Sequence, residues 1–146
     1  MSTNRPAWMD TTVTVDKSLA DIRKLMMRYG ADRWSFPESA SGDVDVYFEF
    51  HGQPVTLSLK AAQVFNRLKN LAPRSDLNKL REQSRRVVAR QAFYYLKAVF
   101  EIVETGIFSP IDVLLPHFIL PSGQSVKDMV IELQPRMKLL QSGDVN

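Results

Sequence analysis

The sequence predicts an α+β fold, in which a small antiparallel β-sheet (a hairpin plus one or two short strands) packs against one long and two shorter helices. Two observations predict it. Apolar and polar residues alternate through most of residues 44–59, as they do in strands with one buried face. Helical patterns follow, and residues 75–105 contain neither glycine nor proline. Strands grouped apart from helices are typical of α+β domains.

The first helix is predicted over residues 18–29. Ser18 has the character of an N-cap, and Asp21 stands three residues later, at the spacing of a capping box. Gly30 follows the segment, where a glycine commonly ends a helix. Apolar residues recur between these signals at helical spacing: Leu19, Ile22, Leu25, Met26 and Tyr29.

A β-hairpin is predicted over residues 44–59. Apolar residues alternate with polar ones on both sides of a turn at residues 51–54, which contain glycine and proline. Trp34 and Phe36 are expected in a third strand, before a turn at residues 39–43. The apolar residues that define the buried face are Val44, Val46, Phe48, Phe50, Val55, Leu57 and Leu59.

The rest of the chain is predicted to be mainly helical. Residues 61–71 fit either a short helix or a structured crossover, and Ser75 is the expected N-cap of the long helix, which ends near Gly106. A short helical turn after residue 109 and a short strand at residues 116–120 come next. A last helix starts after Ser125, and Pro135 is expected to kink or end it.

Length and composition indicate a single globular domain. We expect it to span residues 15–140 of the 146-residue chain, between a flexible N-terminal tail (residues 1–14) and a C-terminal tail (residues 141–146). With no cysteine, the chain cannot form disulfides, zinc–thiolate sites or iron–sulfur clusters. The start of the chain does not resemble a signal peptide, and no apolar stretch is long enough to span a bilayer. We therefore expect a cytoplasmic protein without membrane contact.

Positive charge is concentrated on the predicted long helix. Residues 74–97 contain seven basic and two acidic residues, a net charge of +5, whereas the whole chain carries +3 and the remainder therefore −2. A helical wheel places the basic residues opposite to or beside an apolar face, which consists of Leu77, Leu80, Ser84, Val88, Gln91, Tyr95, Ala98 and Ile102. Beyond residue 90 the helix is apolar nearly all round, so we expect its second half to be buried and its first half to project charge.

This charged face predicts a nucleic-acid-binding surface, since lysine and arginine neutralise backbone phosphates without reading the base sequence. The alternative is a solvated face that keeps the domain soluble. The predicted nucleic-acid-binding residues are Lys79, Arg81, Arg85, Arg86, Arg90 and Lys97.

Catalytic, metal and cofactor sites are not expected. His51 and His117 have no ligand-type residue three or four positions away, although His117 could act as a base if Asp112 lay beside it. Scattered single glycines argue against a phosphate-cradling loop. Asp43, Asp45 and Glu49 could hold a cation, but such residues are also typical of the solvent-exposed face of a hairpin. Trp34, Phe36 and Tyr47 could stack bases, but core packing is the more common role of such aromatic residues.

Several segments resemble a known family. Lys17-Ser18 leads into a helix ending Arg28-Tyr29-Gly30-Ala31, a hairpin and a long helix follow, and residues 97–107 and 117–126 carry Glu-Thr-Gly-Ile and His-Phe-Ile-Leu-Pro-Ser-Gly. Together they resemble a family of small uncharacterised proteins carried by bacteriophages, prophages and metagenomic contigs. The resemblance implies a mobile-element origin and the same order of elements. It implies no established activity and transfers no catalytic residue.

The leading hypothesis is therefore a non-enzymatic, phage-type accessory protein that binds nucleic acid or a nucleoprotein complex through its basic long helix. The first alternative is a protein inhibitor of a host defence or nucleic-acid-processing complex, with a host protein as partner. The second is a metal-dependent hydrolase that uses the sheet carboxylates or His117. The oligomeric state stays open.

Overall fold

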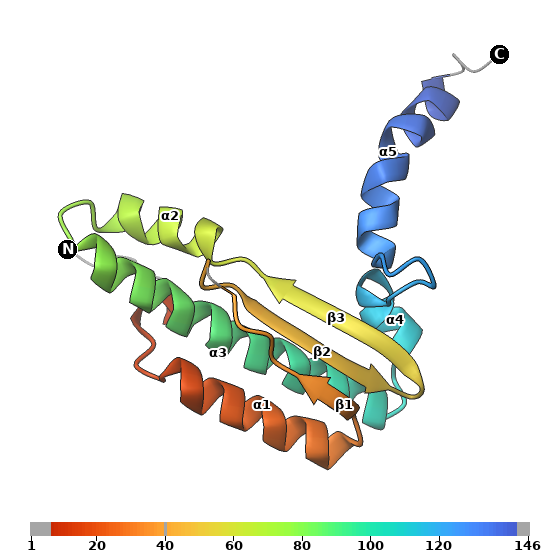
Figure 1. Cartoon of the computed structure of the whole chain (residues 1–146), viewed down its shortest axis with the longest axis horizontal. Coiled ribbons are helices and arrows are strands. Elements are labelled where there is room, and N and C mark those ends of the chain that lie inside the picture. Colours follow the sequence, from red (N-terminus) through yellow and green to blue (C-terminus); the bar gives the residue numbers. More distant parts are fainter. Residues whose placement is uncertain (1–6, 40, 143–146) are drawn as a thin grey trace.

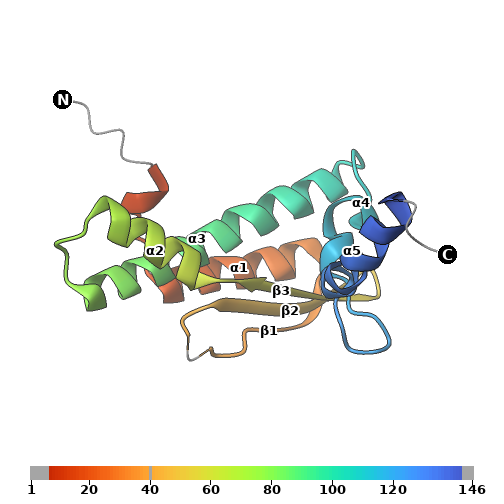
Figure 2. The same cartoon turned by 90° about the horizontal axis from the view of Figure 1, so that it is seen from above.

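The computed structural model describes residues 7–39 and 41–142, and it confirms the predicted α+β class. Figure 1 shows a three-stranded antiparallel sheet in the order β1-β2-β3, and Figure 2 shows α1 and α3 together on one face of it. In chain order the elements are η1 (Ala7–Asp10), α1 (Val15–Tyr29), β1 (Asp32–Ser35), β2 (Val44–Phe50), β3 (Gln53–Leu59), α2 (Ala61–Leu71), α3 (Leu77–Glu104), α4 (Pro110–Leu114), η2 (Leu115–His117) and α5 (Val126–Ser142).

The hairpin forms as the alternation of apolar and polar residues predicts. Val44 pairs with Leu59 and Phe50 with Gln53, so the turn is tighter than expected and consists of His51 and Gly52. Both turn residues have positive φ, the backbone that a two-residue hairpin loop requires. The third strand is also present: β1 pairs with β2 and contains Trp34, but it ends at Ser35, before Phe36.

The main core lies between the sheet and the helices. Phe100 of α3 contacts Phe48 and Phe50 of β2, with ring centroids 5.7 and 5.1 Å away, and it stacks on Tyr29 of α1 at 5.6 Å. Val88, Ala92 and Leu96 of α3 join this core at four-residue intervals before Phe100. Because an α-helix has 3.6 residues per turn, such a row of buried residues winds slowly around the helix.

Part of the predicted apolar face of α3 is wrong. Leu77, Gln91, Tyr95 and Ala98 are exposed, because a face extrapolated from the first turn drifts away from the true buried stripe over 28 residues. The second half is not buried all round either, since Tyr94 is 58% exposed. The sheet and α1 cover only one side of the helix.

Two predicted helix caps need correction, and one open alternative is resolved. The first helix starts at Val15, and its N-cap is Thr14, whose Oγ1 accepts a hydrogen bond from the Lys17 backbone N–H (3.1 Å). Ser18, the expected cap, is fully buried within the helix. Asp76 rather than Ser75 caps α3, where its carboxylate accepts from Asn78 N at 2.7 Å. Residues 61–71 form a helix, α2, which resolves the open alternative.

The C-terminal region differs most from expectation. Instead of a strand at residues 116–120, the chain forms η2 and two isolated bridges, Val55 with Phe118 and Ile119 with Ser125. Pro116 lies within η2, and proline has no backbone N–H for a ladder. The Ser125 cap is confirmed, because its Oγ accepts from Asp128 N (3.1 Å), but α5 continues through Pro135. Figure 1 shows α5 extending away from the sheet.

A second, smaller core lies at the other end of α3. It consists of Met9, Leu68 and Leu80, which come from η1, α2 and α3 respectively. Gln83 Nε2 donates to the Met9 and Thr11 carbonyl oxygens at 3.0 and 2.8 Å. Part of the segment expected as an N-terminal tail therefore packs on the domain. Within the described ranges, no helix has the length and apolarity that crossing a bilayer would require.

The aromatic contacts of Phe100 give a direct test of the main core. We expect Phe100→Ala to lower the free energy of unfolding by about 3–5 kcal/mol, because it leaves a cavity beside Phe48, Phe50 and Tyr29. Leu77→Ala, in the exposed first turn of the same helix, is the matched control and should change stability by less than about 0.5 kcal/mol. Urea unfolding followed by circular dichroism measures both. Equal effects would contradict this account of the core.

Candidate nucleic-acid interface

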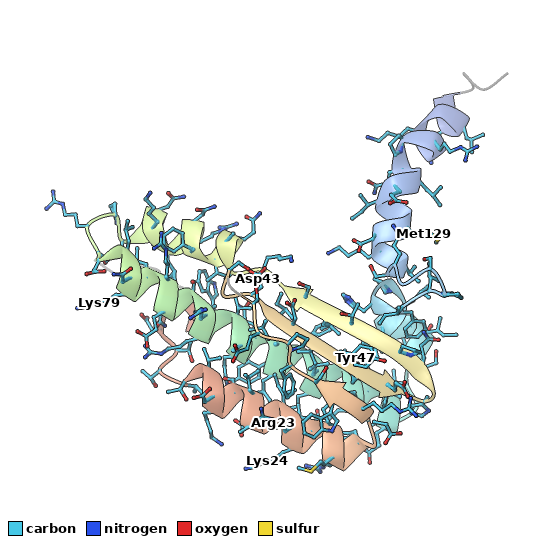
Figure 3. All side chains as sticks on the ribbon, viewed as in Figure 1. Arg23, Lys24, Asp43, Tyr47, Lys79 and Met129 are labelled. Carbon is cyan, nitrogen blue, oxygen red and sulfur yellow. The ribbon has the colours of Figure 1, made fainter. Side chains whose placement is uncertain are left out.

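Three of the predicted basic residues line one open groove with a volume of about 1130 Å³. Arg81, Arg85 and Arg86 form its wall on α3, and the starts of α1 and α2 and the loop between β1 and β2 complete it. We call this the α3 groove. In Figure 3, Asp43 marks the loop side of the groove, beside the start of α2, and Lys79 lies toward the N-terminal end of α3.

Arg81 and Arg85 are exposed, and neither has an acidic partner within residues 7–39 and 41–142. Both are nevertheless held in place. The Arg81 guanidinium lies 5.6 Å from the centroid of the Phe65 ring, a cation–π contact. Arg85 lies against Gly42, where an added Cβ would come within 2.6 Å of its Nε atom. Two charges are thus positioned without being neutralised.

The other two cations of the groove are paired. Arg86 donates to Glu82 at 2.8 Å, one turn back on α3, and Lys60 Nζ lies 3.4 Å from Asp43. Asp43 also accepts a hydrogen bond from the backbone N–H of Ala61, the first residue of α2 (2.8 Å). This hydrogen bond is the largest cause that lowers the pKa of the Asp43 carboxyl below its usual range, and Lys60 has a smaller effect in the same direction.

The lining of the groove contains four basic and three acidic residues, a net charge of +1. Two of those acids, Glu82 and Asp43, are already paired within the groove. The third acid is Asp16, at the start of α1. The unpaired positive charge of the groove is therefore centred on Arg81 and Arg85.

Arg90 braces two helices. Its Nη1 donates to Asp21 of α1 at 2.9 Å, and its guanidinium stacks on Phe93 and Tyr94, with centroids 4.2 and 5.1 Å away. Its side chain is 17% exposed. Asp21 also accepts from Lys17 at 2.7 Å, and these hydrogen bonds, from Lys17 first and then Arg90, lower the pKa of Asp21. Asp21 thus joins α1 to α3 instead of closing a capping box.

The remaining predicted residues lie outside the α3 groove. Lys97 is half exposed and lies 4.0 Å from Glu101, the next turn of α3. Lys79 is exposed in the first turn of α3. It lies at the same end of the helix as the α3 groove but does not line the groove. The groove adds residues that the charge pattern did not single out, such as Lys60, Gln63 and Asn78, because only the packing of α2 on α3 places them there.

The sheet carboxylates serve separate local contacts. Asp45 accepts from the Ser58 hydroxyl at 2.6 Å, and Glu49 lies 3.5 Å from Arg33. In the part of the chain that the structure describes, no three His, Asp or Glu side chains are grouped so that they could hold a metal ion. Trp34 and Phe36 contact each other at 5.8 Å and pack against the main core.

His117 lies in an aromatic and basic environment. It is half-buried beside the Tyr95 ring, with centroids 6.1 Å apart, and burial together with the charge of Lys127 lowers its pKa. Asp112, the carboxylate weighed as its partner, instead closes a capping box with Ser109 at the start of α4. The two side chains therefore do not form the acid–base pair that the sequence allowed.

The brace between α1 and α3 gives a pH-dependent prediction. Because the pKa of Asp21 is lower in the folded chain than its ordinary value of 3.8, its contribution to stability is present at neutral pH and is lost as pH falls through the folded pKa. We expect Asp21→Asn to unfold at lower urea concentration than wild type at pH 7, and the difference to shrink toward about pH 3.

The control for this prediction is Glu101→Gln, which removes the half-exposed pair with Lys97. Exposed ion pairs contribute little, so this variant should match wild type at both pH values. A difference between Asp21→Asn and wild type that stays constant with pH would contradict an ionic role for the brace.

No protein-family model, curated protein or solved structure matches this chain. The resemblance to phage-borne proteins therefore stays a prediction from its motifs.

Proposed function

We propose that this protein is a non-enzymatic nucleic-acid-binding protein that holds a sugar–phosphate backbone in the α3 groove. The observation that carries the proposal is the pair Arg81 and Arg85, which are exposed and without an acidic partner in the described residues, one turn apart on the wall of an open groove. Phosphates attract such charges regardless of base sequence, since binding releases condensed counterions.

Preorganisation of the two arginines supports this function. Four residues of α-helix rise about 6 Å, so both guanidinium groups can reach one backbone, and each can bind a phosphate with two parallel hydrogen bonds. Phe65 restrains Arg81, and the close approach of Gly42 restrains Arg85. A side chain already restrained in the free protein loses less conformational entropy on binding than a free one does.

The dimensions of the groove favour a polymer over a small phosphorylated molecule. Its volume of about 1130 Å³ exceeds the roughly 300–1,000 Å³ of ordinary ligand pockets. Lys79 lies beyond it at the same end of α3, which extends the positive surface along the helix. A chain with many phosphates can contact the groove and this extension together. We also propose a mobile-element origin for this protein, as its resemblance to phage-borne proteins implies.

A protein partner is the second candidate, and a separate observation favours it. Ile107, Phe108 and Ile111 follow the end of α3 and are all exposed, Ile107 to 69%. Clustered exposed apolar side chains are typical of protein contact sites. An accessory protein could then bind nucleic acid at one end of α3 and a protein at the other, as the inhibitor and nucleoprotein alternatives require. A partner that stays bound after nuclease treatment, but is lost in Ile107→Asp, would support this candidate.

Affinity and its salt dependence test the leading proposal. We expect Arg81→Ala and Arg85→Ala each to weaken binding of single- or double-stranded DNA or RNA, and each to reduce the slope of log K against log salt by about one, because each removes one phosphate contact. Fluorescence anisotropy with labelled oligonucleotides at several salt concentrations measures both quantities.

Lys97→Ala is the matched control, since it removes one positive charge from the same helix outside the groove. It should leave affinity nearly unchanged. The proposal fails if none of the four nucleic acids binds at low salt, or if Lys97→Ala weakens binding as much as Arg85→Ala does.

A further inference from the structure

A second groove, with a volume of about 590 Å³, lies on the other side of α2 from the first. Gln63, an exposed residue of α2, lines both grooves. The apolar part of the second groove is formed by Trp8, Val64 and Leu71, and the polar part by side chains of α2 and α3: Gln63, Arg67, Asn70 and Gln91. We call it the Trp8 groove.

Trp8 is held in position by its own backbone. The neighbouring Met9 is buried in the smaller core, and Gln83 Nε2 donates to its carbonyl oxygen at 3.0 Å and to that of Thr11 at 2.8 Å. The indole is half-buried and packs against the same core, while part of it lines the groove. An aromatic ring fixed in this way provides a stacking surface that needs little further ordering.

The polar wall has the chemistry that recognises a base edge. Gln63, Asn70 and Gln91 are exposed, and none of their side-chain amides has a hydrogen-bond partner in the described parts of the chain. An amide offers both donors and an acceptor, as the Watson–Crick edge of an unpaired base does. Arg67, exposed on α2 and without an acidic partner among the same residues, adds a cation.

We propose that the Trp8 groove binds one unpaired nucleobase, and that the ligand of this protein is therefore single-stranded nucleic acid. The inference rests on the proposed function, because a strand whose backbone lies in the α3 groove would pass over α2 at Gln63 and place a later base on Trp8. A duplex cannot make this contact while its bases are paired and stacked inside the helix. Stacking on an aromatic ring tolerates any base, so little sequence preference is expected.

The test compares four probes that share one length of about 12 nucleotides: single-stranded DNA, single-stranded RNA, duplex DNA, and a DNA strand whose residues are abasic. Anisotropy should show tighter binding of the single strands than of the abasic strand, which has the same phosphates without bases. Trp8→Ala should weaken binding of the single strands by roughly 5- to 150-fold and leave the abasic strand unchanged. The ratio of DNA to RNA affinity tells which of the two is the natural ligand chemistry.

Fluorescence provides a second readout. The chain has two tryptophans, so a Trp34→Phe background isolates Trp8, whose emission should be quenched by single strands but not by the abasic strand. Gln91→Ala is the companion variant, because this exposed side chain supports no packing: it should weaken single-strand binding without changing the urea midpoint. Trp8→Phe should retain most of the affinity, since a ring remains.

The outcomes separate the two proposals. If all four probes bind equally, Trp8 emission does not change, and Arg85→Ala still weakens binding, the base-binding inference is overturned and the proposed function stands. If no probe binds at low salt, both fail. If Trp8→Ala weakens the abasic strand and the single strands alike, the ring acts only through the fold and the inference is overturned.

Discussion

The structure depends on the burial of one aromatic side chain, Phe100, where the long helix crosses the sheet. It contacts two phenylalanines of β2 and Tyr29 at the end of α1, so it joins the three elements that form the main core. With α3 fixed there, its first half meets η1 and α2 at the second core, around Met9, Leu68 and Leu80. One helix therefore connects two hydrophobic clusters, and both grooves lie at the end with the smaller one.

Local periodicity was enough to predict most of the fold. The hairpin and the long helix follow from alternation and from the absence of helix breakers, because both depend on neighbours in the chain. Helix starts were less predictable, because each helix has two residues of a good N-cap type near its start. Tertiary packing selects Thr14 over Ser18 for α1, and Asp76 over Ser75 for α3. The strand expected at residues 116–120 failed because its contact with β3 is a bridge at Val55, outside any extended ladder.

The candidate site was predictable as a charged segment but not as a surface. The density of basic residues pointed to the first half of α3, where the α3 groove lies, yet charge density does not tell which cations stay unpaired. Glu82 is four residues from Arg86, so that pair could have been found in the sequence. The partner of Arg90 is Asp21, 69 residues earlier, and only the packing of α1 on α3 brings them together. Trp8 offered no signal, since its position in the groove depends on the hydrogen bonds that Gln83 donates to the backbone of η1 and the residues after it.

The position of η1 has a practical consequence for handling the protein. Figures 1 and 2 place it at the groove end of α3, whereas α5 extends from the opposite end. The first described residue, Ala7, is next to Trp8, so a fusion partner joined directly to η1 would compete with a strand for the same space. A cargo attached after α5 is far from both grooves. A surface-based binding assay should therefore immobilise the protein through its C-terminus, which leaves both grooves accessible.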